Sequence, residues 1–422
     1  MFDRGIDKAH LLQFYTDQIE NSFFRFWNSA VDRQNGGIFN CFNNAGTTLV
    51  SRDKYTWSQG RFVWIWSRLY ELSKRGVLSL DMKTIGEDLA RTVRFLEDHV
   101  FMQNGNCVYL TNGNGNWIES IPGKGFDTSF YADCFVALGF SAYARAFKDR
   151  HYLDLALQTY RRINKRVDQC QLRSEPYPIP NGYKFHSVPM IMLNVGEELA
   201  LTLETLDDKR AKDVESESCR YMDEIMEVFY DDDQGRIIET IGPDGVILNN
   251  VLCRHVNPGH AIEDMWFVME LAKRKDRVEY IEKARGAVKW AIKIGWDSEF
   301  GGLFRFVDVT GGQPQGERTG DVYETLILDT WDTKLWWPHS EMLYATLLSY
   351  SLTGDNEFLS LYNRAHEYAF NTFPDNHNNT GEWVQIRDRK GKPINKVVAL
   401  PVKDPYHILR DMILIIELLE QL

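Results

Sequence analysis

The sequence predicts an all-α protein, an (α/α)6 barrel of twelve helices with short strands in the loops at the pocket end. Three observations support this prediction. Apolar residues recur at helical spacing along most of the chain. Very short links join consecutive helices into pairs, and one short motif occurs twice. Stacked helix pairs bury one another's apolar faces, and six such pairs can close into a barrel.

The apolar periodicity gives each helix a position in the chain. The predicted ranges are 8–28, 56–75, 81–101, 127–147, 151–165, 186–205, 209–229, 259–274, 276–294, 333–353, 355–371 and 404–421. Links such as Lys148-Asp149-Arg150 and Thr353-Gly354-Asp355 are so short that the helices they join must be antiparallel neighbours. Longer links, such as 104–125 and 296–320, are rich in Gly, Asn and Asp. We expect them to form the short strands and binding loops.

A repeated motif links two distant parts of the chain. Trp27, Asp32 and the run Gly36-Gly-Ile-Phe39 recur as Trp296-Asp297 and Gly301-Gly-Leu-Phe304, each time after an amphipathic helix. No Pro/Ser-rich linker or block of charge divides the chain. We therefore expect a single domain over residues 1–422.

Composition excludes several classes of partner. The 422-residue chain has a formal net charge of -12, which argues against nucleic acid and against an anionic membrane surface. Its six cysteines are scattered without a CxxC pair, so neither a disulfide framework nor a metal cluster is expected. The N-terminus has no apolar signal core, and no run approaches the length of a membrane span. These features predict a cytoplasmic protein.

The segment 254–266 carries the first chemical signal. Pro258 and Gly259 precede an apolar run at helical spacing, which marks a helix N-terminus. His260 and Glu263 are three residues apart and share one face of the first turn. A carboxylate in that place can fix one imidazole nitrogen and leave the other facing a substrate. The alternative is a surface loop whose histidine bonds only the backbone.

The predicted helices alternate in character along the chain. Odd-numbered helices carry charged faces, whereas even-numbered ones are rich in aromatic and small residues. Unusual polar residues lie near the starts of the even helices: Arg61, Tyr131, Asp133, His260, Glu263, Glu341 and His407. If the even helices form the inner ring, all these residues converge on one pocket. Helix N-termini there would favour developing negative charge.

Seven fragments resemble a known family when they are taken in order. They are Trp57-Ser-Gln-Gly-Arg61, Phe130-Tyr-Ala-Asp-Cys-Phe-Val136, Pro189-Met-Ile-Met-Leu-Asn194, Pro258-Gly-His-Ala-Ile-Glu263, Trp336-Trp-Pro-His-Ser-Glu341, Gly381-Glu-Trp383 and Pro405-Tyr-His407. Through them the chain resembles the N-acylglucosamine 2-epimerase family, which also contains the renin-binding protein, cellobiose 2-epimerases and aldose–ketose isomerases. The resemblance runs nearly end to end, and the (α/α)6 barrel that it implies agrees with the helix count.

Epimerisation beside a sugar carbonyl sets clear chemical requirements. The C2 proton must leave and return, so a base is wanted on each face of C2, and a neutral imidazole suits that task. A fixed cation stabilises the charge that grows on the carbonyl oxygen. The resemblance implies His260 and His407 as the acid/base residues, Arg61 as the cation and Glu263 as the partner of His260. The predicted substrate-binding residues are Tyr131, Asp133, Met192, Trp337, Glu341 and Trp383.

One position departs from part of the wider family. Isomerases and cellobiose epimerases of this type carry an extra histidine on the inner helix after the middle of the chain, where this sequence has Met192. A thioether offers bulk without a proton and suits an N-acetyl group, which favours the N-acylhexosamine branch. His186, six residues earlier, keeps the isomerase alternative open.

These observations lead to one main hypothesis and three alternatives. The main hypothesis is a 2-epimerase that interconverts N-acyl-D-glucosamine and N-acyl-D-mannosamine and needs no cofactor for its chemistry. The alternatives are an aldose–ketose isomerase or 2-epimerase of an unacylated sugar, an inverting glycoside hydrolase that uses two of Asp133, Glu263 and Glu341, and a non-catalytic binding protein. The resemblance also implies a homodimer and ATP as an activator, although the sequence has no GxxxxGK[ST] loop.

Overall fold

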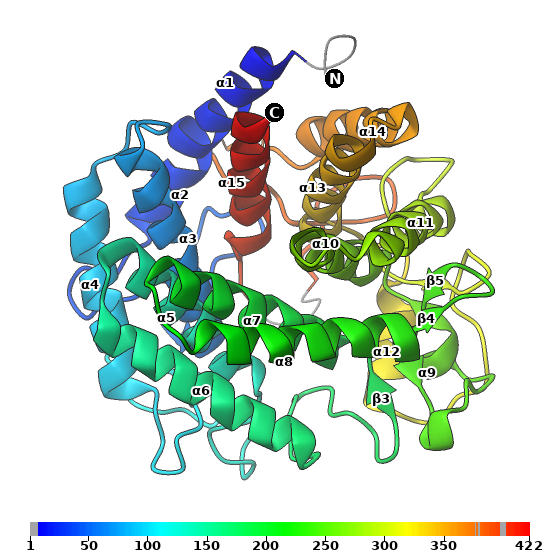
Figure 1. The fold of residues 1–422 in the computed structure, drawn as a ribbon, viewed down its shortest axis with the longest axis horizontal. Helices are drawn as coiled ribbons and strands as arrows, with labels where there is room; N and C mark the ends of the chain where they lie inside the picture. The colour runs from blue at the N-terminus through cyan, green and yellow to red at the C-terminus, as the bar shows by residue number, and fades with distance from the viewer. Residues whose placement is uncertain (1–6, 376, 379, 397–401) are drawn as a thin grey trace.

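The computed structural model describes residues 7–375, 377–378, 380–396 and 402–422. Its helices form an inner and an outer ring around one axis (Figure 1). The inner helices are α3 (Thr56–Lys74), α5 (Tyr131–Phe147), α7 (Ser187–Thr205), α10 (Pro258–Arg274), α13 (Trp336–Thr353) and α15 (Tyr406–Gln421). The outer helices are α1 (Lys8–Gln18), α2 (Phe24–Ser29), α4 (Met82–His99), α6 (Arg150–Asp168), α8 (Ala211–Glu224), α11 (Val278–Gly295) and α14 (Asn356–Thr372).

The inner ring is closed. Helix α3 packs on α5, α5 on α7, α7 on α10, α10 on α13, α13 on α15, and α15 returns to α3. Each of the first five inner helices also packs on the outer helix that follows it, and α1 packs on α15. The even-numbered helices of the sequence prediction are therefore the inner ones, and the predicted (α/α)6 barrel is confirmed.

Inner and outer helices differ in how much of their surface is buried. In α5 only Tyr131, Arg145 and Phe147 keep part of their surface exposed, because this helix is enclosed on all sides. In the outer helix α4 the buried apolar residues lie on one face: Ile85, Leu89, Val93, Phe95 and Leu96. An all-round apolar sequence is typical of an enclosed helix, and a single stripe is typical of a helix with one face in water.

Two glycines let the first inner helices touch. A Cβ atom at Gly60 would lie 2.2 Å from the carbonyl oxygen of Phe135, and one at Gly139 would lie 2.5 Å from the carbonyl oxygen of Gly60. Real side chains do not tolerate such distances, so α3 and α5 approach closely only because both positions lack a Cβ. This contact brings Arg61, the next residue on α3, over the ring of Phe135 at 4.1 Å.

Short antiparallel strand pairs hold the starts of the inner helices. The pairs are β1 (Lys54–Tyr55) with β2 (Leu110–Thr111), β3 (Lys184–Phe185) with β6 (Thr240–Ile241), β4 (Tyr230–Asp231) with β5 (Arg236–Ile237), β7 (His255–Val256) with β8 (Val307–Asp308), and β9 (Lys334–Leu335) with β10 (Ile386–Arg387). Strands β1, β3, β7 and β9 lead into α3, α7, α10 and α13. The predicted strands at the pocket end are therefore present, and they fix where four inner helices begin.

Some helix boundaries differ from the prediction. The first helix contains a π-helical turn over Ile19–Phe23, and a second such turn, Ile225–Phe229, follows α8. Helix α5 begins at Tyr131 rather than at 127, since Ser129 pairs with Ser174 in a β-bridge. The short helices α9 (Val251–Arg254) and α12 (Val322–Thr330) were not predicted. The side chains of Asn250 and Asp321 cap their first turns.

The repeated motif folds into two equivalent hairpins. In the first, Lys54 donates to Asp32 at 2.8 Å and to the carbonyl of Gly36 at 2.7 Å. In the second, Lys334 donates to Asp297 at 3.2 Å and to the carbonyl of Gly302 at 3.0 Å. Both lysines are completely buried. The motif therefore binds a lysine that stands directly before an inner helix.

The two hairpins are also equivalent at the residue five positions after each lysine, whose side chain bonds the backbone of the motif. The side-chain oxygen of Gln59 accepts from the backbone N–H of Ile38 at 2.7 Å, and Nε2 of His339 accepts from that of Leu303 at 2.8 Å. The other nitrogen of His339, Nδ1, donates to the carbonyl of Leu335 at 2.6 Å. Both ring nitrogens are thus used by the neutral form of His339.

Lowering the pH from 7 to 5 is expected to destabilise the native protein through His339. Burial, helped by the charge of Lys334, lowers the pKa of His339 to about 3. An unfolded histidine binds a proton near pH 6.5, so the unfolded state gains stability as the pH falls below that value. This effect amounts to about 2 kcal/mol at pH 5. Urea unfolding at pH 7 and pH 5 should show that His339→Gln loses about 2 kcal/mol less than wild type over this range. Equal losses would contradict the argument.

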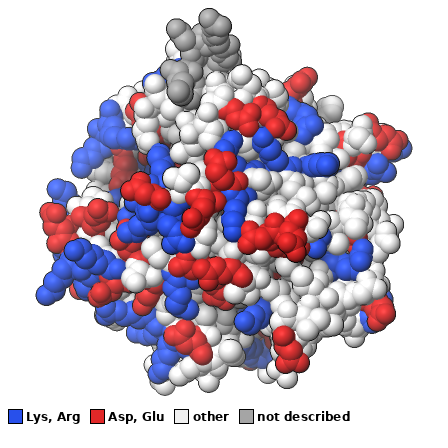
Figure 2. Space-filling view, turned by 45° about the vertical axis from the view of Figure 1, so that its right-hand side comes forward, with Lys and Arg blue, Asp and Glu red and all other residues white. Residues whose placement is uncertain are grey.

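Acidic and basic side chains alternate over the surface shown in Figure 2, and neither sign gathers into a broad patch on that face. Arg274 illustrates the pattern, since it contacts Glu197 and also Glu215 at 3.0 Å. Within the described ranges, no helix combines the length and the low polarity that a membrane crossing requires.

Candidate active site

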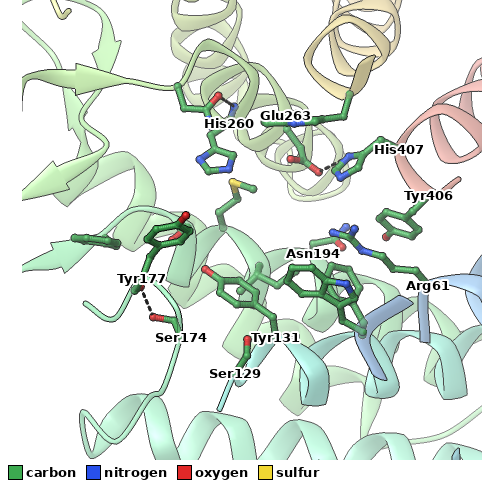
Figure 3. Close-up of a pocket in the computed structure, with 18 of the residues that line it drawn as sticks. Arg61, Ser129, Tyr131, Ser174, Tyr177, Asn194, His260, Glu263, Tyr406 and His407 are labelled. Carbon is green, nitrogen blue, oxygen red and sulfur yellow. Dashed lines mark hydrogen bonds and ion pairs between the residues drawn. The ribbon is translucent and has the colours of Figure 1, made fainter. Parts of the chain in front are cut away.

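A cavity of about 320 Å³ opens where the inner helices begin. Residues from α3, α5, α7, α10, α13 and α15 line it, so all six inner helices contribute. Its size suits a small ligand. Figure 3 shows His260 and His407 on one side of this space, with Tyr131 and Ser129 on the other. The predicted convergence of helix starts on one pocket is therefore seen.

His260 lies in the first turn of α10 and reaches the cavity. Helix α10 begins at Pro258, and the side chain of Asn257 caps it by accepting from the backbone N–H groups of Gly259 and His260. The Nδ1 atom of His260 lies 2.5 Å from Oε1 of Glu239. Attraction to His260 and His186 outweighs burial and lowers the pKa of Glu239, so this carboxylate is ionised. An ionised carboxylate only accepts, so Nδ1 carries the hydrogen and Nε2 is left for a ligand.

The predicted partner of His260 was wrong. Glu263 shares the first turns of α10 with His260, as expected, but its carboxylate turns to the opposite side and contacts Arg410 and His407. The residue that holds His260 is Glu239, which lies in the link before α9. Nothing in the spacing of Glu239 and His260 along the chain indicates this contact.

His407 reaches the cavity from the first turn of α15. Its Nδ1 atom lies 2.7 Å from Oε1 of Glu341 and 3.7 Å from Oε1 of Glu263. Burial lowers the pKa of His407 to about 3; Glu263 opposes this shift, and the positive charge of Arg410 adds to it. The ring is therefore neutral at pH 7, as a base must be.

Arg410 holds the two carboxylates beside His407. Its guanidinium contacts Oε1 of Glu263 and lies 2.5 Å from Oε1 of Glu341. The side chain is almost completely buried, and Trp266 donates to the second oxygen of Glu341 at 2.8 Å. Glu263, Glu341 and His407 are near enough to one another to form a metal-binding group. The guanidinium bonded to both carboxylates instead supplies the positive charge there.

Arg61 brings a cation to the cavity wall. It donates to Asp404 at 2.7 Å, and its guanidinium lies over the rings of Phe135 at 4.1 Å and Tyr406 at 4.9 Å. Asp404 also accepts from the backbone N–H of Tyr406 at 2.7 Å, which fixes the start of α15. Arg61 is therefore held in place by the same turn that presents His407.

Aromatic side chains complete the cavity. The ring of Trp337 lies 5.4 Å from that of His260 and 5.3 Å from that of His407, so it spans the gap between the two histidines. Tyr131 lines the wall below them (Figure 3). Both residues are where the sequence prediction put them.

Four other predicted substrate-binding residues do not line the cavity. Asp133 faces away from it and pairs with Arg166 at 3.0 Å. Met192 is completely buried in the core. Trp383 is also buried and stacks on Phe373. Glu341 supports His407 from behind rather than facing the cavity. The structure therefore does not bring these four side chains to the cavity wall, where the sequence prediction expected them.

The wrong choice on α7 has a simple geometric cause. Met190, Ile191 and Asn194 line the cavity, and a helix places positions three and four apart on one face, as Asn194 is from Ile191 and from Met190. Position 192 is rotated by about 200° from position 190 and faces the neighbouring helices. The residue type proposed for this part of the wall, a methionine, is nevertheless present as Met190.

Several further residues line the cavity without any indication in the sequence pattern. They are Ser174, Tyr177, Ile179, Arg305, Tyr323 and Leu326. These residues lie in links or in the unpredicted helix α12, where apolar periodicity carries no information about direction.

Comparison with known proteins places this geometry in a family. The family model of N-acylglucosamine 2-epimerase (GlcNAc 2-epimerase) matches residues 37–410. The chain belongs to the N-acylglucosamine 2-epimerase family. Among its relatives, the N-acylglucosamine 2-epimerase of Bos taurus is 30% identical over 407 residues, which cover 94% of this chain and 88% of the relative. The enzyme of the same name from Homo sapiens is 28% identical and covers 93% and 87%.

Several solved structures are similar to this chain in fold. A cellobiose 2-epimerase from Bacillus thermoamylovorans superposes with a TM-score of 0.76 at 18% identity, over 97% of this chain and 99% of that one. A D-mannose isomerase superposes with a TM-score of 0.72 at 17% identity, over 98% of both chains. At such identities the likeness concerns the fold, and the arrangement of the six helix pairs is the shared feature.

Proposed function

We propose that this member of the N-acylglucosamine 2-epimerase family interconverts N-acyl-D-glucosamine and N-acyl-D-mannosamine by moving a proton at C2. The observation that carries the proposal is a pair of imidazoles on one cavity, each with Nδ1 bonded to a buried carboxylate. This arrangement leaves two Nε2 atoms for a ligand bound between them. The curated relatives named N-acylglucosamine 2-epimerase supply the substrate class.

The reaction follows from these groups in two steps. The Nε2 atom of one histidine takes the C2 proton of the open-chain sugar, and the electron pair moves towards the carbonyl oxygen. Arg61 faces the developing oxyanion and stabilises it. The second histidine, which has taken up a solvent proton on Nε2 for this step, gives that proton to C2 from the other face and so inverts that carbon. The first histidine then releases the original C2 proton to solvent. Glu239 and Glu341 keep the Nδ1 protons throughout.

The wall of α7 fits the acyl group. Met190 and Ile191 offer an apolar surface, and the side-chain oxygen of Asn194 is buried without a hydrogen-bond partner among the described residues. An amide N–H is the kind of group that satisfies such an oxygen. An acetamido group meets both demands, whereas a hydroxyl at C2 meets only one.

Proton NMR of N-acetylglucosamine in D2O tests the proposal. The full-length protein should replace the C2 proton with deuterium while signals of N-acetylmannosamine grow. Parallel samples with mannose, glucose and cellobiose test the alternative of an unacylated substrate, and ketose signals would identify an isomerase. If N-acetylglucosamine keeps its C2 proton, the proposal fails.

The hydrolase alternative lacks its carboxylate pair. An inverting hydrolase needs two carboxyl groups on opposite sides of the substrate, roughly 6.5–9.5 Å apart. Glu263 and Glu341 instead share Arg410, and Asp133 is paired with Arg166 away from the cavity. None of these three can therefore form an opposed pair with another.

Replacing Arg61 with methionine is expected to lower kcat by about 10²–10³-fold, the effect of removing one donor to a developing oxyanion. Methionine keeps much of the length and the contact with Phe135 but loses the charge. Arg61→Lys should lose less, because its ammonium keeps the charge without the planar fork. Initial rates by NMR, with folding checked by circular dichroism, measure the effect. A kcat within twofold of wild type would remove Arg61 from the mechanism.

The proposed chemistry uses only these side chains, and the role proposed for ATP is that of an activator. Adding ATP or a non-hydrolysable analogue to the same NMR sample distinguishes an activator from a nucleotide that must be hydrolysed. Equal activation by both would support an activator, and activation that requires hydrolysis would contradict it.

Sedimentation of the same samples tests the proposed homodimer.

A further inference from the structure

Three buried residues behind His260 form a chain that the proposed reaction does not use directly. Glu239 bonds Nδ1 of His260, and its other oxygen, Oε2, lies 3.7 Å from Nδ1 of His186. The Nε2 atom of His186 lies 2.7 Å from Oδ2 of Asp264. His186 and Asp264 have no exposed surface, and Glu239 has almost none. The order is thus Asp264, His186, Glu239, His260.

The fold holds these residues in register. Strands β3 and β6 pair Phe185 with Thr240, and the backbone N–H of His186 donates to the carbonyl of Glu239 at 3.1 Å. Asp264 lies on α10, four residues after His260, so it comes from the same helix as the histidine at the other end of the chain. This row of four side chains therefore connects α10 to the β3–β6 pair at both of its ends.

His186 supplies the positive charge in this chain. Burial alone would lower its pKa, but the carboxylates of Asp264 and Glu239 outweigh burial and raise the pKa of His186 to about 10. Attraction to His260 also lowers the pKa of Glu239. Three further groups near Glu239 are neutral, because burial raises the pKa of Tyr131 and Tyr323 and lowers that of His255. The imidazolium of His186 thus stabilises the ionised form of Glu239.

The two catalytic histidines are supported in parallel but by different cations. Behind His407, the carboxylate of Glu341 is held by Arg410. Behind His260, the carboxylate of Glu239 faces the imidazolium of His186. Each half consists of an imidazole, a carboxylate and a buried cation, and among the described residues the halves share no member.

We infer that His186 and Asp264 are positioning residues for His260 alone, and that they act on one of the two proton transfers. Without the imidazolium, the buried Glu239 turns away or takes up a proton, and Nδ1 of His260 loses its acceptor. The ring then populates the tautomer with hydrogen on Nε2, which cannot take a proton from C2. In the wild type the C2 proton moves to Nε2 and the proton on Nδ1 stays where it is. This inference rests on the proposed function.

Solvent exchange in D2O separates the two transfers. N-acetylglucosamine and N-acetylmannosamine are each given to wild type, His186→Gln and Asp264→Asn. The measured quantity is the ratio of deuterium entering C2 of the starting sugar to product formed. When proton transfer by His260 is slow, the enediolate formed by His407 from its own sugar persists. It is then reprotonated from the same face with deuterium from solvent, which gives back the starting sugar labelled at C2. The ratio for that sugar should rise about tenfold in His186→Gln and stay constant for the other. This is less than the roughly 10²–10⁴-fold effect of a whole acid/base group, because His260 itself is still present. Asp264→Asn should give a smaller rise for the same sugar.

His339→Gln is the matched control. His339 is buried as completely as His186, lies on an inner helix and bonds only backbone groups. Its replacement lowers the amount of folded protein, which changes both rates together and leaves both ratios at the wild-type value. If His186→Gln also leaves both ratios unchanged, or raises them equally, the inference is overturned.

A second measurement needs no turnover. Spectra of ¹⁵N-labelled histidine should show His260 as the Nδ1–H tautomer in wild type and in His339→Gln, and as a mixture of tautomers in His186→Gln. An unchanged His260 signal in His186→Gln would overturn the inference. If wild type exchanges no C2 proton of any sugar, the proposed function fails, and the histidine spectrum still decides whether His186 controls the ring of His260.

Discussion

His407→Asn is expected to lower net epimerisation by about 10³-fold while the enzyme still exchanges the C2 proton of one sugar with solvent. His260→Asn is expected to show the same behaviour with the other sugar. Each variant lacks the base on one face of C2 but keeps the other imidazole, with its carboxylate intact. The surviving histidine can remove a proton from its own face and return a deuteron there, without inverting the carbon.

The measurement is NMR of both sugars in D2O, run separately for each variant. Asparagine keeps a polar side chain of similar reach, which limits changes in packing. Complementary exchange, with one sugar for each variant, also assigns each histidine to one face. If either variant epimerises at the wild-type rate, the two-histidine mechanism is wrong. Exchange of both sugars by one variant would show that a single group serves both faces.

Arg410→Met is expected to lower the free energy of unfolding by about 3–5 kcal/mol, the usual cost of breaking a buried ion pair from one side. The guanidinium contacts Glu263 and Glu341, which are themselves buried. Methionine fills part of the volume against Tyr406 but leaves two carboxylates without their cation. Urea unfolding at pH 7 measures the change.

Two further variants separate charge from shape at this site. Arg410→Lys keeps the charge and should lose less stability than Arg410→Met. The double variant Glu263→Gln with Arg410→Met removes one of the stranded charges and should recover part of the loss. A loss within about 0.5 kcal/mol for Arg410→Met, typical of a surface substitution, would show that the cluster does not depend on this cation.

The barrel was predictable because its signal is periodic. Alternating apolar stripes and all-round apolar helices repeat along the chain, and the closed inner ring follows from their order. The helix start at Pro258 was predictable because proline and glycine punctuate the pattern locally. His260, His407, Arg61 and Trp337 reach the cavity because each lies in the first turn or two of an inner helix.

The support behind the histidines could not be predicted in the same way. Glu239 reaches His260 from a link, and its direction is set by the pairing of β3 with β6, which leaves no periodic trace in the sequence. Glu263 has the right spacing to hold His260 but finds a stronger partner in Arg410, which lies 147 residues away. Met192 shows the remaining limit, since a shift of two positions on a helix turns a side chain from the cavity into the core.

The strand pairs at the pocket end mark the boundary between the helical barrel and the connecting segments that extend beyond it. Because β1, β3, β7 and β9 fix where four inner helices begin, the segments beyond these strands can change in length or sequence without moving His260 or Arg61. The barrel then holds the proton-transfer groups in fixed positions. The connecting segments at the pocket end, here called the rim, can vary and determine which sugar binds. Grafting rim segments between barrels, with the cuts made at the strand pairs, is accordingly a rational route to new substrate preferences.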